Sequence, residues 1–478
     1  MDILLIDPPY TSLKGIPTDV GYNMGLTSLA AYLRGGGIQT SIIMGDLLAG
    51  LPPADGWVSS SLEDYALKQE EYRATVSDEK HPVWEKLAAF VHEYHPLAVG
   101  ISYLTPLKCS VEMVARTVKK VDPRIKIILG GPHPTFCPDE VIANPDVDFV
   151  VQGEGEIPLL ALIRELKKDS PNLATIPSIY YRAGGGAPRN NPGTSLIRDL
   201  NRLPFPAREA VLNCDYGSYR GHAMLTARGC PYRCAFCADK SMWKGKVRRR
   251  SIESVIDELR HIKNTYHVDL IDFQDGTFTF DRDYVERFCD AVIGNNLKLS
   301  WGCTARYDNL DERLIDLMKN AGCSGMYFGL ESGSNRMLEA VGKRTTVEQI
   351  IEVSDMIYSS GIPSATSVIL GLPEEGKQDI EATLSLMQKV KTDIFDVNSY
   401  VPLPGSPLFE EMASRDKNGI DWGTAAYKSL DNHFSRVITL DELRGYLLTA
   451  YRIADDVRKT TLSRCQSAVR DSGQISSI

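Results

Sequence analysis

Short apolar runs alternate with amphipathic stretches along the first 165 residues of the chain. The run at residues 3–6, Ile-Leu-Leu-Ile, ends at Asp7-Pro8-Pro9 and is typical of a strand that is buried on both faces. Three similar runs follow, at 98–102, 125–131 and 148–153. Apolar residues at helical spacing accompany them, at 25–34, 82–94, 108–120 and 156–168. The alternation predicts an α/β domain, Rossmann-like, with an open, doubly wound parallel sheet whose ligands bind beyond the carboxyl ends of the strands.

A second alternation begins after residues 183–206, which are rich in Gly, Pro and Asn and predict a linker with turns. Its β-like runs lie at 223–227, 270–273, 299–303, 325–330, 365–370 and 396–401. Amphipathic segments lie between them, at 252–265, 281–294, 311–321, 346–360 and 377–392. Six βα units are too few for a closed eightfold barrel and predict a partial (β/α)6 barrel. A last helix is expected near 440–460, and the tail after Cys465 is expected to be poorly ordered.

The predicted elements divide the chain into four parts. Residues 1–165 form the doubly wound domain, 166–215 the linker, 216–430 the partial barrel, and 431–478 a helical region with its tail. Because 43% of the 478 residues are hydrophobic, the chain has enough apolar side chains for more than one core.

Charge and cysteine usage narrow the class of protein. The chain carries 53 Lys and Arg against 62 Asp and Glu, a net charge of −9, which gives no overall field to attract nucleic acid. It contains neither an apolar run of 18 residues nor a secretory signal, so we expect a cytoplasmic protein without a membrane span. Thiols stay reduced in that compartment, and the ten cysteines are therefore not expected to form a disulfide framework.

Three of the ten cysteines are clustered. Cys230, Cys234 and Cys237 follow a Cys-x3-Cys-x2-Cys pattern in the loop after the first strand of the second domain. A structural zinc site would need a fourth ligand, such as His222 or Asp239. Three thiolates on one loop can instead hold three irons of a [4Fe–4S] cluster and leave the fourth iron open for a ligand. The spacing favours the cluster.

This loop resembles that of the radical S-adenosylmethionine (SAM) superfamily, in which the open iron binds the amino and carboxylate groups of SAM. Gln274-Asp275-Gly276 is similar to the segment that binds the methionine amino group, although many relatives have a second acidic residue where this chain has Gly276. Residues 367–374 resemble the adenine motif Gly-x-Ile-x-Gly-x-x-Glu, with Ser367 for the first glycine. By the same resemblance, Arg306 would clamp the SAM carboxylate and Glu331 would lie at the ribose. The implied SAM contacts are Phe236, Asp275, Arg306, Glu331, Ser332, Ile369 and Tyr400.

The first domain resembles a cobalamin-binding fold. Ser102-Tyr103-Leu104 and Gly130-Gly131 match its Ser-x-Leu and Gly-Gly elements, where glycine lets the backbone approach the nucleotide tail of the cofactor. The third element, Asp-x-His-x-x-Gly, is missing, because residues 7–12 contain no histidine that could ligate cobalt. Together with the cysteine loop, this pattern is similar to that of the cobalamin-dependent, class B radical SAM enzymes. The implied cobalamin contacts are Pro8, Ser102, Tyr103, Leu104, Thr105, Gly130, Gly131, His133, Gly153, Glu154 and Gly155.

His133 admits two interpretations. It could replace the missing histidine as a cobalt ligand, or it could hydrogen-bond the nucleotide tail or a propionamide of cobalamin. The second is favoured, because the family usually leaves the lower face of cobalt without histidine. Tyr103 or Thr105 could then face that side of cobalt.

The resemblance implies a C-methyltransferase with three cofactors, a [4Fe–4S] cluster, SAM and cobalamin as methylcobalamin. The methyl acceptor would be an unactivated carbon of a peptide, a protein or a small molecule, with a peptide or protein side chain favoured. An electron donor such as ferredoxin or flavodoxin would reduce the cluster. No catalytic side chain on the substrate side is assigned.

Three alternatives stay open. A cobalamin-dependent radical SAM cyclase or ring-rearranging enzyme, acting on a small natural product without net methylation, would share the same motifs. A tRNA methylthiotransferase would need a second cysteine triad in the first domain, which holds only Cys109 and Cys137, and the acidic charge disfavours RNA. A non-catalytic corrinoid carrier would need no cysteine triad.

Overall fold

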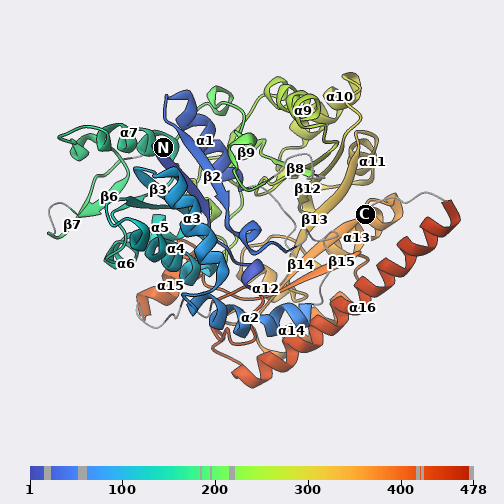
Figure 1. The fold of residues 1–478 in the computed structure, drawn as a ribbon. Coiled ribbons are helices and arrows are strands. Elements are labelled where there is room, and N and C mark those ends of the chain that lie inside the picture. The colour runs from blue at the N-terminus through green and yellow to red at the C-terminus, as the bar shows by residue number, and fades with distance from the viewer. Residues whose placement is uncertain are drawn as a thin grey trace.

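The computed structural model describes residues 1–14, 23–51, 62–182, 186–193, 196–214, 221–415, 420, 422 and 425–472. Two α/β units lie side by side, and a long C-terminal helix runs along one edge of the molecule (Figure 1). Residues 183–185, 194–195 and 215 of the predicted linker and residues 473–478 of the predicted tail lie outside the described residues.

The first unit is built on a seven-stranded sheet in the order β2-β1-β3-β4-β5-β6-β7. Its strands are β1 (Ile3–Asp7), β2 (Thr40–Met44), β3 (Ala98–Ser102), β4 (Lys126–Gly130), β5 (Phe149–Val151), β6 (Ile179–Arg182) and β7 (Pro188–Asn190). The strands β1 to β5 run parallel, whereas β6 and β7 add antiparallel at one edge, within the segment expected to be a linker. The strand order reverses between β1 and β3, where such sheets bind ligands at their carboxyl ends.

Helices cover both faces of this sheet, which confirms the doubly wound prediction. They are α1 (Met24–Gly35), α2 (Leu62–Ser77), α3 (Pro82–Tyr94), α4 (Lys108–Val121), α5 (Pro132–Phe136), α6 (Pro138–Ala143) and α7 (Glu156–Leu166). Leu4 and Ile6 of β1 enter an apolar cluster with α3 and α4, while Ile3 and Leu5 enter a second cluster with α1 and α7. Because β1 packs against an apolar cluster on each face of the sheet, all of its residues at 3–6 must be apolar, as the sequence shows.

The second unit is a sheet of six parallel strands in the order β15-β14-β13-β12-β11-β8, the partial barrel that the sequence predicts. The strands are β8 (Gly221–Met224), β11 (Leu270–Phe273), β12 (Ser300–Ala305), β13 (Cys323–Glu331), β14 (Ser364–Leu370) and β15 (Ile394–Ser399). The helices are α8 (Asp239–Met242), α9 (Ile252–Tyr266), α10 (Arg282–Gly294), α11 (Glu312–Asn320), α12 (Asn335–Ala340), α13 (Val347–Ser360) and α14 (Lys377–Met387). A short antiparallel pair, β9 (Ala227–Arg228) and β10 (Arg248–Arg249), flanks the cysteine loop.

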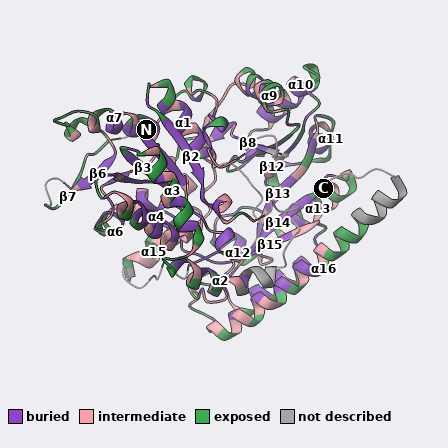
Figure 2. Ribbon diagram, in the orientation of Figure 1, coloured by how far each residue is buried: buried purple, intermediate pink, exposed green. Residues whose placement is uncertain are grey.

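The barrel strands β11, β12 and β15 bury one face and leave the other partly open. On β11, Ile271 and Phe273 are buried in the core with the outer helices, whereas Leu270 and Asp272 are exposed. Purple, the colour of buried residues, predominates on the barrel strands β13, β14 and β15 in Figure 2. A Cβ built on Gly325 of β13 would meet no atom within 4 Å. Because successive side chains of a strand point to opposite faces, the open set lines the inside of the barrel.

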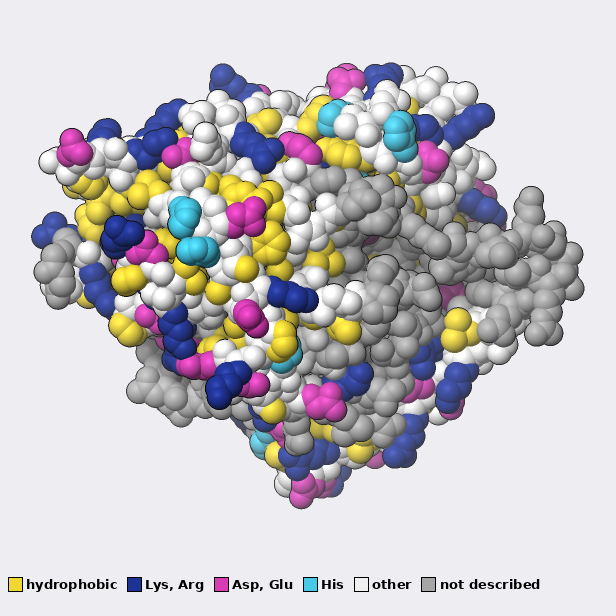
Figure 3. Space-filling view, viewed as in Figure 1, with side chains coloured by type: hydrophobic (Ala, Val, Ile, Leu, Met, Phe, Trp, Pro, Cys, Tyr) yellow, Lys and Arg dark blue, Asp and Glu magenta, His cyan; other side chains and the backbone are white. Residues whose placement is uncertain are grey.

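Two helices complete the chain, α15 (Pro407–Arg415) and α16 (Leu440–Ser472). The apolar side of α16 joins the barrel core through Leu443, Leu447 and Tyr451. The helix α16 continues to Ser472, within the segment after Cys465 that the sequence predicts to be poorly ordered. Within the described parts of the chain, no helix is both long and apolar enough to cross a membrane. Basic and acidic side chains are interspersed on the face shown in Figure 3.

Loops at the carboxyl ends of the two sheets touch one another. Glu154, which follows β5, pairs with Arg228 of β9. The ring of His133, after β4, lies 5.5 Å from that of Trp422. A Cβ built on Gly405, after β15, would lie 2.5 Å from the ring of Phe136. The ligand-binding edges of the two sheets therefore face each other.

Candidate functional site

The cysteine loop lies between β9 and α8 at the carboxyl end of the barrel. Its three thiols are free and half-buried. The backbone is fixed because the N–H of Ala235 donates to the carbonyl of Val341 at 2.8 Å, and the N–H of Cys237 donates to that of Cys234 at 3.1 Å. These hydrogen bonds hold the loop that carries three potential sulfur ligands.

The arrangement of the thiols is not that of a zinc site. A tetrahedral zinc ion with Zn–S bonds of about 2.3 Å would gather its ligands within about 4 Å of each other. Among the described residues, His133, Cys137 and Glu140 have potential metal-ligand atoms that all lie within 4.8 Å of one another. The three cysteines of the loop do not form such a group. His222 lies near the amino end of β8, away from the loop, with its ring 4.9 Å from Tyr266. The three thiols are therefore not gathered as closely as the ligands of one tetrahedral zinc ion would be.

The positive charges of Lys343 and Arg306 would balance part of the negative charge that the cysteines carry as thiolates. Burial raises the pKa of the Cys234 thiol, while the positive charges of Lys343 and Arg306 oppose that rise. The guanidinium of Arg306 stacks 3.8 Å from the ring centre of Tyr232, within the cysteine loop. Asp308 holds the Nε and Nη2 atoms of Arg306 at 2.8 and 2.7 Å. Arg306 is therefore fixed beside the loop, at the end of β12.

Glu331 ends β13 in a left-handed conformation with φ of 67°. Its Oε1 accepts a hydrogen bond from Lys343 at 2.8 Å, and both side chains are 7% exposed. A Cβ on Gly329 would lie 2.1 Å from the Glu331 Oε1 and 2.5 Å from the Lys343 Nζ, so a larger residue there would displace this ion pair. Ser332 is fully buried, and its Oγ lies 3.3 Å from the Oγ1 of Thr383. Lys343 is not predicted from the sequence, because its pairing with Glu331 exists only in the folded chain.

Asp275 has a different environment from the one expected of a SAM ligand. Both of its carboxylate oxygens accept hydrogen bonds from the backbone N–H of Thr226, and the N–H of Ala227 also donates to it. Burial raises the pKa of Asp275 to about 6, although these donors oppose the rise. Asp275 thereby ties the end of β11 to the segment that leads into the cysteine loop.

An apolar cluster brings together three of the residues assigned to SAM. Phe236 and Ile369 pack against buried Tyr400, together with Met337, Val341 and Leu372. The Tyr400 hydroxyl is buried and has no hydrogen-bond partner among the described residues. A buried hydroxyl without a partner is costly, so the Tyr400 hydroxyl is a candidate to bond a polar group of a ligand.

Two neighbouring glutamates follow β14 and have separate roles. Glu374, in the motif position, is exposed and pairs with Arg436 at 2.7 Å. Glu375 is fully buried, and its Oε2 accepts the N–H groups of Gly371 at 2.7 Å and Leu372 at 3.3 Å. Burial raises the pKa of Glu375 to about 8, although the two N–H groups oppose the rise. The turn at the adenine motif therefore depends on Glu375, which the motif comparison passed over.

Replacing Glu375 with Gln is expected to change how stability depends on pH. An ordinary glutamate has a pKa of 4.5, whereas burial raises the pKa of Glu375 to about 8, so the folded state binds this proton more tightly than the unfolded state does. The wild type should then lose stability as the pH rises from about 5 to about 8, whereas Gln, a mimic of the neutral acid, does not titrate. The melting temperature of the wild type minus that of Glu375→Gln should fall over this range. Thermal unfolding at several pH values measures it.

The control for this experiment is Glu374→Gln, which changes the adjacent exposed carboxylate. It should give no comparable dependence on pH above about 5, since exposed ion pairs contribute little. A difference between wild type and Glu375→Gln that is independent of pH would contradict the prediction.

The carboxyl edge of the first sheet gathers the loops assigned to cobalamin. Gly131 has φ of 114°, and a Cβ there would lie 2.9 Å from the carbonyl oxygen of Tyr103, so only glycine fits. The Oγ1 of Thr135 accepts the N–H of Gly153 at 2.9 Å and thereby joins two loops. Leu104 is 47% exposed, and a Cβ on Gly153 would meet no atom within 4 Å. The edge thus offers an open, partly apolar surface that fits a large flat cofactor.

The remaining residues of this set lie on the same edge. Pro8 directly follows β1, Ser102 and Gly130 end β3 and β4 and pair with each other, and Gly155 precedes α7. Tyr103 and Thr105 are buried beneath this edge rather than exposed on it.

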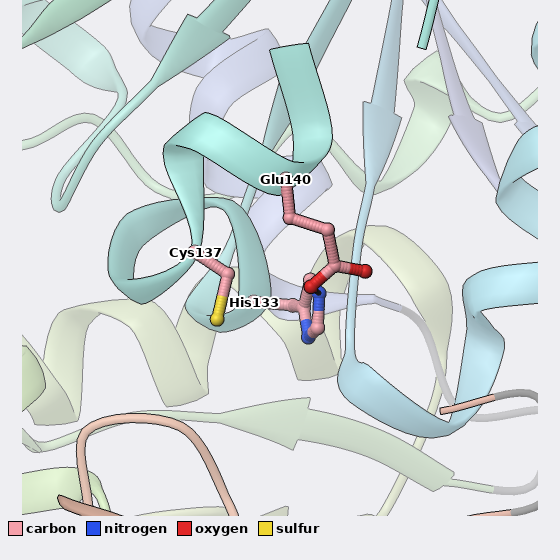
Figure 4. Close-up of side chains that lie close together, drawn as sticks. All are labelled: His133, Cys137 and Glu140. Atoms are coloured by element: carbon pink, nitrogen blue, oxygen red, sulfur yellow. Dashed lines mark ion pairs between the residues drawn. The ribbon is translucent and has the colours of Figure 1, made fainter. Parts of the chain in front are cut away.

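His133 is fully buried behind the same edge. Its Nδ1 lies 3.1 Å from the Oγ1 of Thr105, and its ring stacks 4.4 Å from that of Tyr103. Glu140 reaches toward it, with 3.8 Å between Oε2 and Nε2 (Figure 4). Lys108 already pairs with Glu140 at 2.7 Å, and although burial opposes the shift, His133 and Lys108 lower the pKa of Glu140 to about 2. These contacts favour a supporting role for His133 over ligation of cobalt.

A buried ion-pair network joins the first unit to the cysteine loop. Arg228, two residues before Cys230, donates to Glu154 at 2.7 Å and to Glu156 at 2.6 Å. Arg248 of β10 donates to Glu154 at 2.9 Å. The four charged side chains are each at most 10% exposed. Glu154, assigned from the sequence to cobalamin, therefore links the two units.

The chain matches two family profiles, one for each unit. The profile described as Radical SAM superfamily matches residues 224–387, and the B12 binding domain profile matches residues 17–163.

Relatives of known name agree with these matches. An uncharacterized methyltransferase of Pyrococcus horikoshii, PH0819, is 30% identical over 354 residues, which are 71% of this chain and 76% of that protein. An anaerobic magnesium-protoporphyrin IX monomethyl ester cyclase of Rubrivivax gelatinosus is 28% identical over 340 residues, 67% of this chain and 59% of that protein. The solved structure of the radical SAM methyltransferase TsrM from Kitasatospora setae shares the fold, with a TM-score of 0.64 and 16% identity over 86% of this chain and 76% of that one.

A B12-binding sheet that faces a barrel with a three-cysteine loop defines a two-domain cobalamin and radical SAM enzyme. This chain belongs to the cobalamin-dependent radical SAM methyltransferase family, as its motifs predicted. Its cofactors are a [4Fe–4S] cluster, SAM and cobalamin.

Proposed function

We propose that this protein transfers a methyl group to an unactivated carbon in a side chain of a peptide or protein. When bound, the cluster and SAM supply a 5′-deoxyadenosyl radical that removes hydrogen from carbon, and methylcobalamin supplies the methyl group. The observation that carries the proposal is the contact between the carboxyl ends of the two sheets. It lets one acceptor carbon reach groups held by both domains.

Different side chains of the barrel domain would bind the cluster and SAM. Cys230, Cys234 and Cys237 hold the cluster, and Arg306 and Lys343 lie beside it as compensating charges. The apolar cluster of Phe236, Ile369 and Tyr400 would enclose the adenine and exclude water.

On the other domain, the exposed Leu104 and the open backbone at Gly153 would support the flat corrin. Gly131 keeps the adjacent loop close to Tyr103, and the buried His133 fixes Tyr103 from behind. These residues bind and orient; none of them is required to transfer a proton.

The inside of the barrel supports a large acceptor. Along β11, Leu270 and Asp272 are exposed, as is Gln274 just beyond the strand. An extended peptide segment can enter along this open side, and the Asp272 carboxylate would favour a basic residue near the modified side chain.

The surface beside the cysteine loop suits an acidic electron donor such as ferredoxin or flavodoxin. Arg233, Lys244 and Lys246 are exposed there, and Lys246 packs against Gly229 at the start of the loop. Basic side chains next to the cluster would orient a negatively charged carrier.

The acceptor class is tested by incubating the reconstituted holoenzyme, without oxygen, with SAM that carries a deuterated methyl group. A panel of peptides and a panel of small natural products serve as acceptors, and mass spectrometry follows the label. Label on a peptide side chain supports the proposal. Label only on small molecules would overturn the peptide assignment. An acceptor converted without label would indicate a ring-forming reaction, as in the name of the cyclase relative.

A further inference from the structure

A group of three potential metal ligands lies on the two short helices that follow β4. His133, Cys137 and Glu140 each offer one ligand atom, and these atoms all lie within 4.8 Å of one another (Figure 4). Their spacing, His-x3-Cys-x2-Glu, is that of successive helical turns, which places side chains on the same side. The N–H of Cys137 donates to the carbonyl of His133 at 2.9 Å, and the N–H of Val141 donates to that of Cys137 at 3.1 Å. The backbone therefore keeps this spacing from α5 into α6.

The imidazole of His133 has the environment of a metal-binding histidine. Its Nδ1 lies 3.1 Å from the Oγ1 of Thr105, which can accept the Nδ1–H and leave Nε2 as the neutral ligand atom. The side chain is fully buried, and Nε2 has no hydrogen-bond partner among the described residues. Nε2 instead faces the Oε2 of Glu140 at 3.8 Å. Two ligands of one tetrahedral zinc ion lie within about 4 Å of each other, so this pair has the right separation.

The carboxylate of Glu140 has one oxygen directed at the group and one at a lysine. Lys108 lies 2.7 Å from Oε1, whereas Oε2 faces His133. Lys108 also pairs with Glu112 at 3.1 Å. The charges of a divalent cation and Lys108 would be offset by the two glutamates and by Cys137 as a thiolate, whose proton leaves for solvent when a metal binds. Since the Glu140 side chain is 38% exposed, it can close on the ion and gives it a path of entry from the surface.

The donor set favours zinc over the other common divalent cations. Magnesium and calcium bind oxygen ligands, whereas zinc binds thiolate, imidazole and carboxylate in any combination. Three protein ligands leave the fourth tetrahedral position of zinc for a water molecule.

We propose that the Nε2 of His133, the Sγ of Cys137 and the Oε2 of Glu140 bind one zinc ion. The ion would hold α5 and α6 together and fix the His133 ring against Tyr103, beneath the edge assigned to cobalamin. The site uses none of the cysteines of the cysteine loop, and the inference does not depend on the identity of the methyl acceptor.

The test measures zinc binding by the anaerobic holoenzyme, loaded with its cluster and cobalamin. The protein is treated with a chelator to remove loosely bound metal, incubated with zinc chloride alone and gel-filtered, and its zinc content is measured by elemental mass spectrometry. We expect about one zinc ion per chain. Competition with a chromogenic zinc chelator then gives the affinity. His133→Gln and Cys137→Ser should each weaken zinc binding by about 100-fold or more, because even the partners of metal ligands contribute about 10- to 100-fold.

Two controls locate the zinc. Cys109→Ser is matched to Cys137→Ser, because Cys109 is also a half-buried thiol of the first unit but lies outside the group. It should bind zinc like the wild type. The chain with alanine at all three positions of the cysteine loop should also keep its zinc, which separates this site from zinc bound by the loop.

Melting temperatures distinguish a lost ligand from a misfolded variant. Without zinc, Cys137→Ser and His133→Gln should melt close to the wild type, whereas added zinc should raise the melting temperature of the wild type alone. The proposal is overturned if the wild type retains no zinc, or if Cys137→Ser retains as much as Cys109→Ser. Release of zinc as cobalamin binds would also overturn it, since His133 would then serve that cofactor instead.

Discussion

Replacing Cys230, Cys234 and Cys237 together by alanine is expected to abolish SAM cleavage while leaving cobalamin binding intact. The three thiols are the sulfur donors of the loop between β9 and α8, and without them no cluster is held. The cobalamin edge belongs to the first unit, whose two apolar cores share no residue with the barrel core. Iron content, 5′-deoxyadenosine formed after reduction, and the absorbance of bound cobalamin measure the three consequences.

The matched control is Cys109→Ala, which removes a thiol of similar exposure from the first unit. It should retain both iron and SAM cleavage. Cleavage of SAM by the triple variant would rule out the cluster assignment. Loss of cobalamin from the triple variant would show that the two cofactor sites do not fold independently.

Arg228→Leu is expected to destabilise the folded protein strongly. It leaves the carboxylates of Glu154 and Glu156 buried without this partner, at 1% and 4% side-chain exposure. Breaking a buried ion pair in this way costs about 3–5 kcal/mol. Because Arg228 also leads into the cysteine loop, the change should loosen the loop and lower the iron retained after reconstitution. Urea unfolding of the apoprotein and iron content measure the two effects.

Arg260→Gln is the control for this substitution. Arg260 pairs with Asp257 at 2.9 Å on the surface of α9, where the side chains are 47% and 59% exposed. Exposed pairs contribute about 0–1 kcal/mol, so its unfolding midpoint should stay close to that of the wild type. Equal midpoints for Arg228→Leu and Arg260→Gln would show that the network does not hold the two units together.

The sequence predicted the helices and strands whose buried residues recur at regular spacing along the chain. The run at 3–6 and the helices at 82–94 and 252–265 were predicted to within a residue, because their apolar spacing is regular. The strands β6 and β7 were missed inside the predicted linker, since an exposed edge strand such as β7 carries no apolar pattern. The helix α2 was missed for a related reason, because its apolar residues do not gather on one face.

Site residues could be predicted where their role follows from their spacing in a sequence motif. They could not be predicted where the role depends on contacts with residues that are distant in the sequence. The cysteine loop, and the grouping of Phe236 with Ile369 and Tyr400, follow from motifs. The engagement of Asp275 with backbone N–H groups depends on contacts that are set only by the fold. Likewise, Glu154 lies 74 residues from Arg228 in the sequence, and no local sequence pattern predicts that the two residues form an ion pair.

The central claim is that this enzyme adds a methyl group by way of both SAM and cobalamin. The most direct measurement is the amount of S-adenosylhomocysteine, 5′-deoxyadenosine and methylated acceptor formed together by the anaerobic holoenzyme. We expect one S-adenosylhomocysteine and one 5′-deoxyadenosine for each methyl group found on the acceptor. Formation of 5′-deoxyadenosine and a changed acceptor without S-adenosylhomocysteine would contradict it.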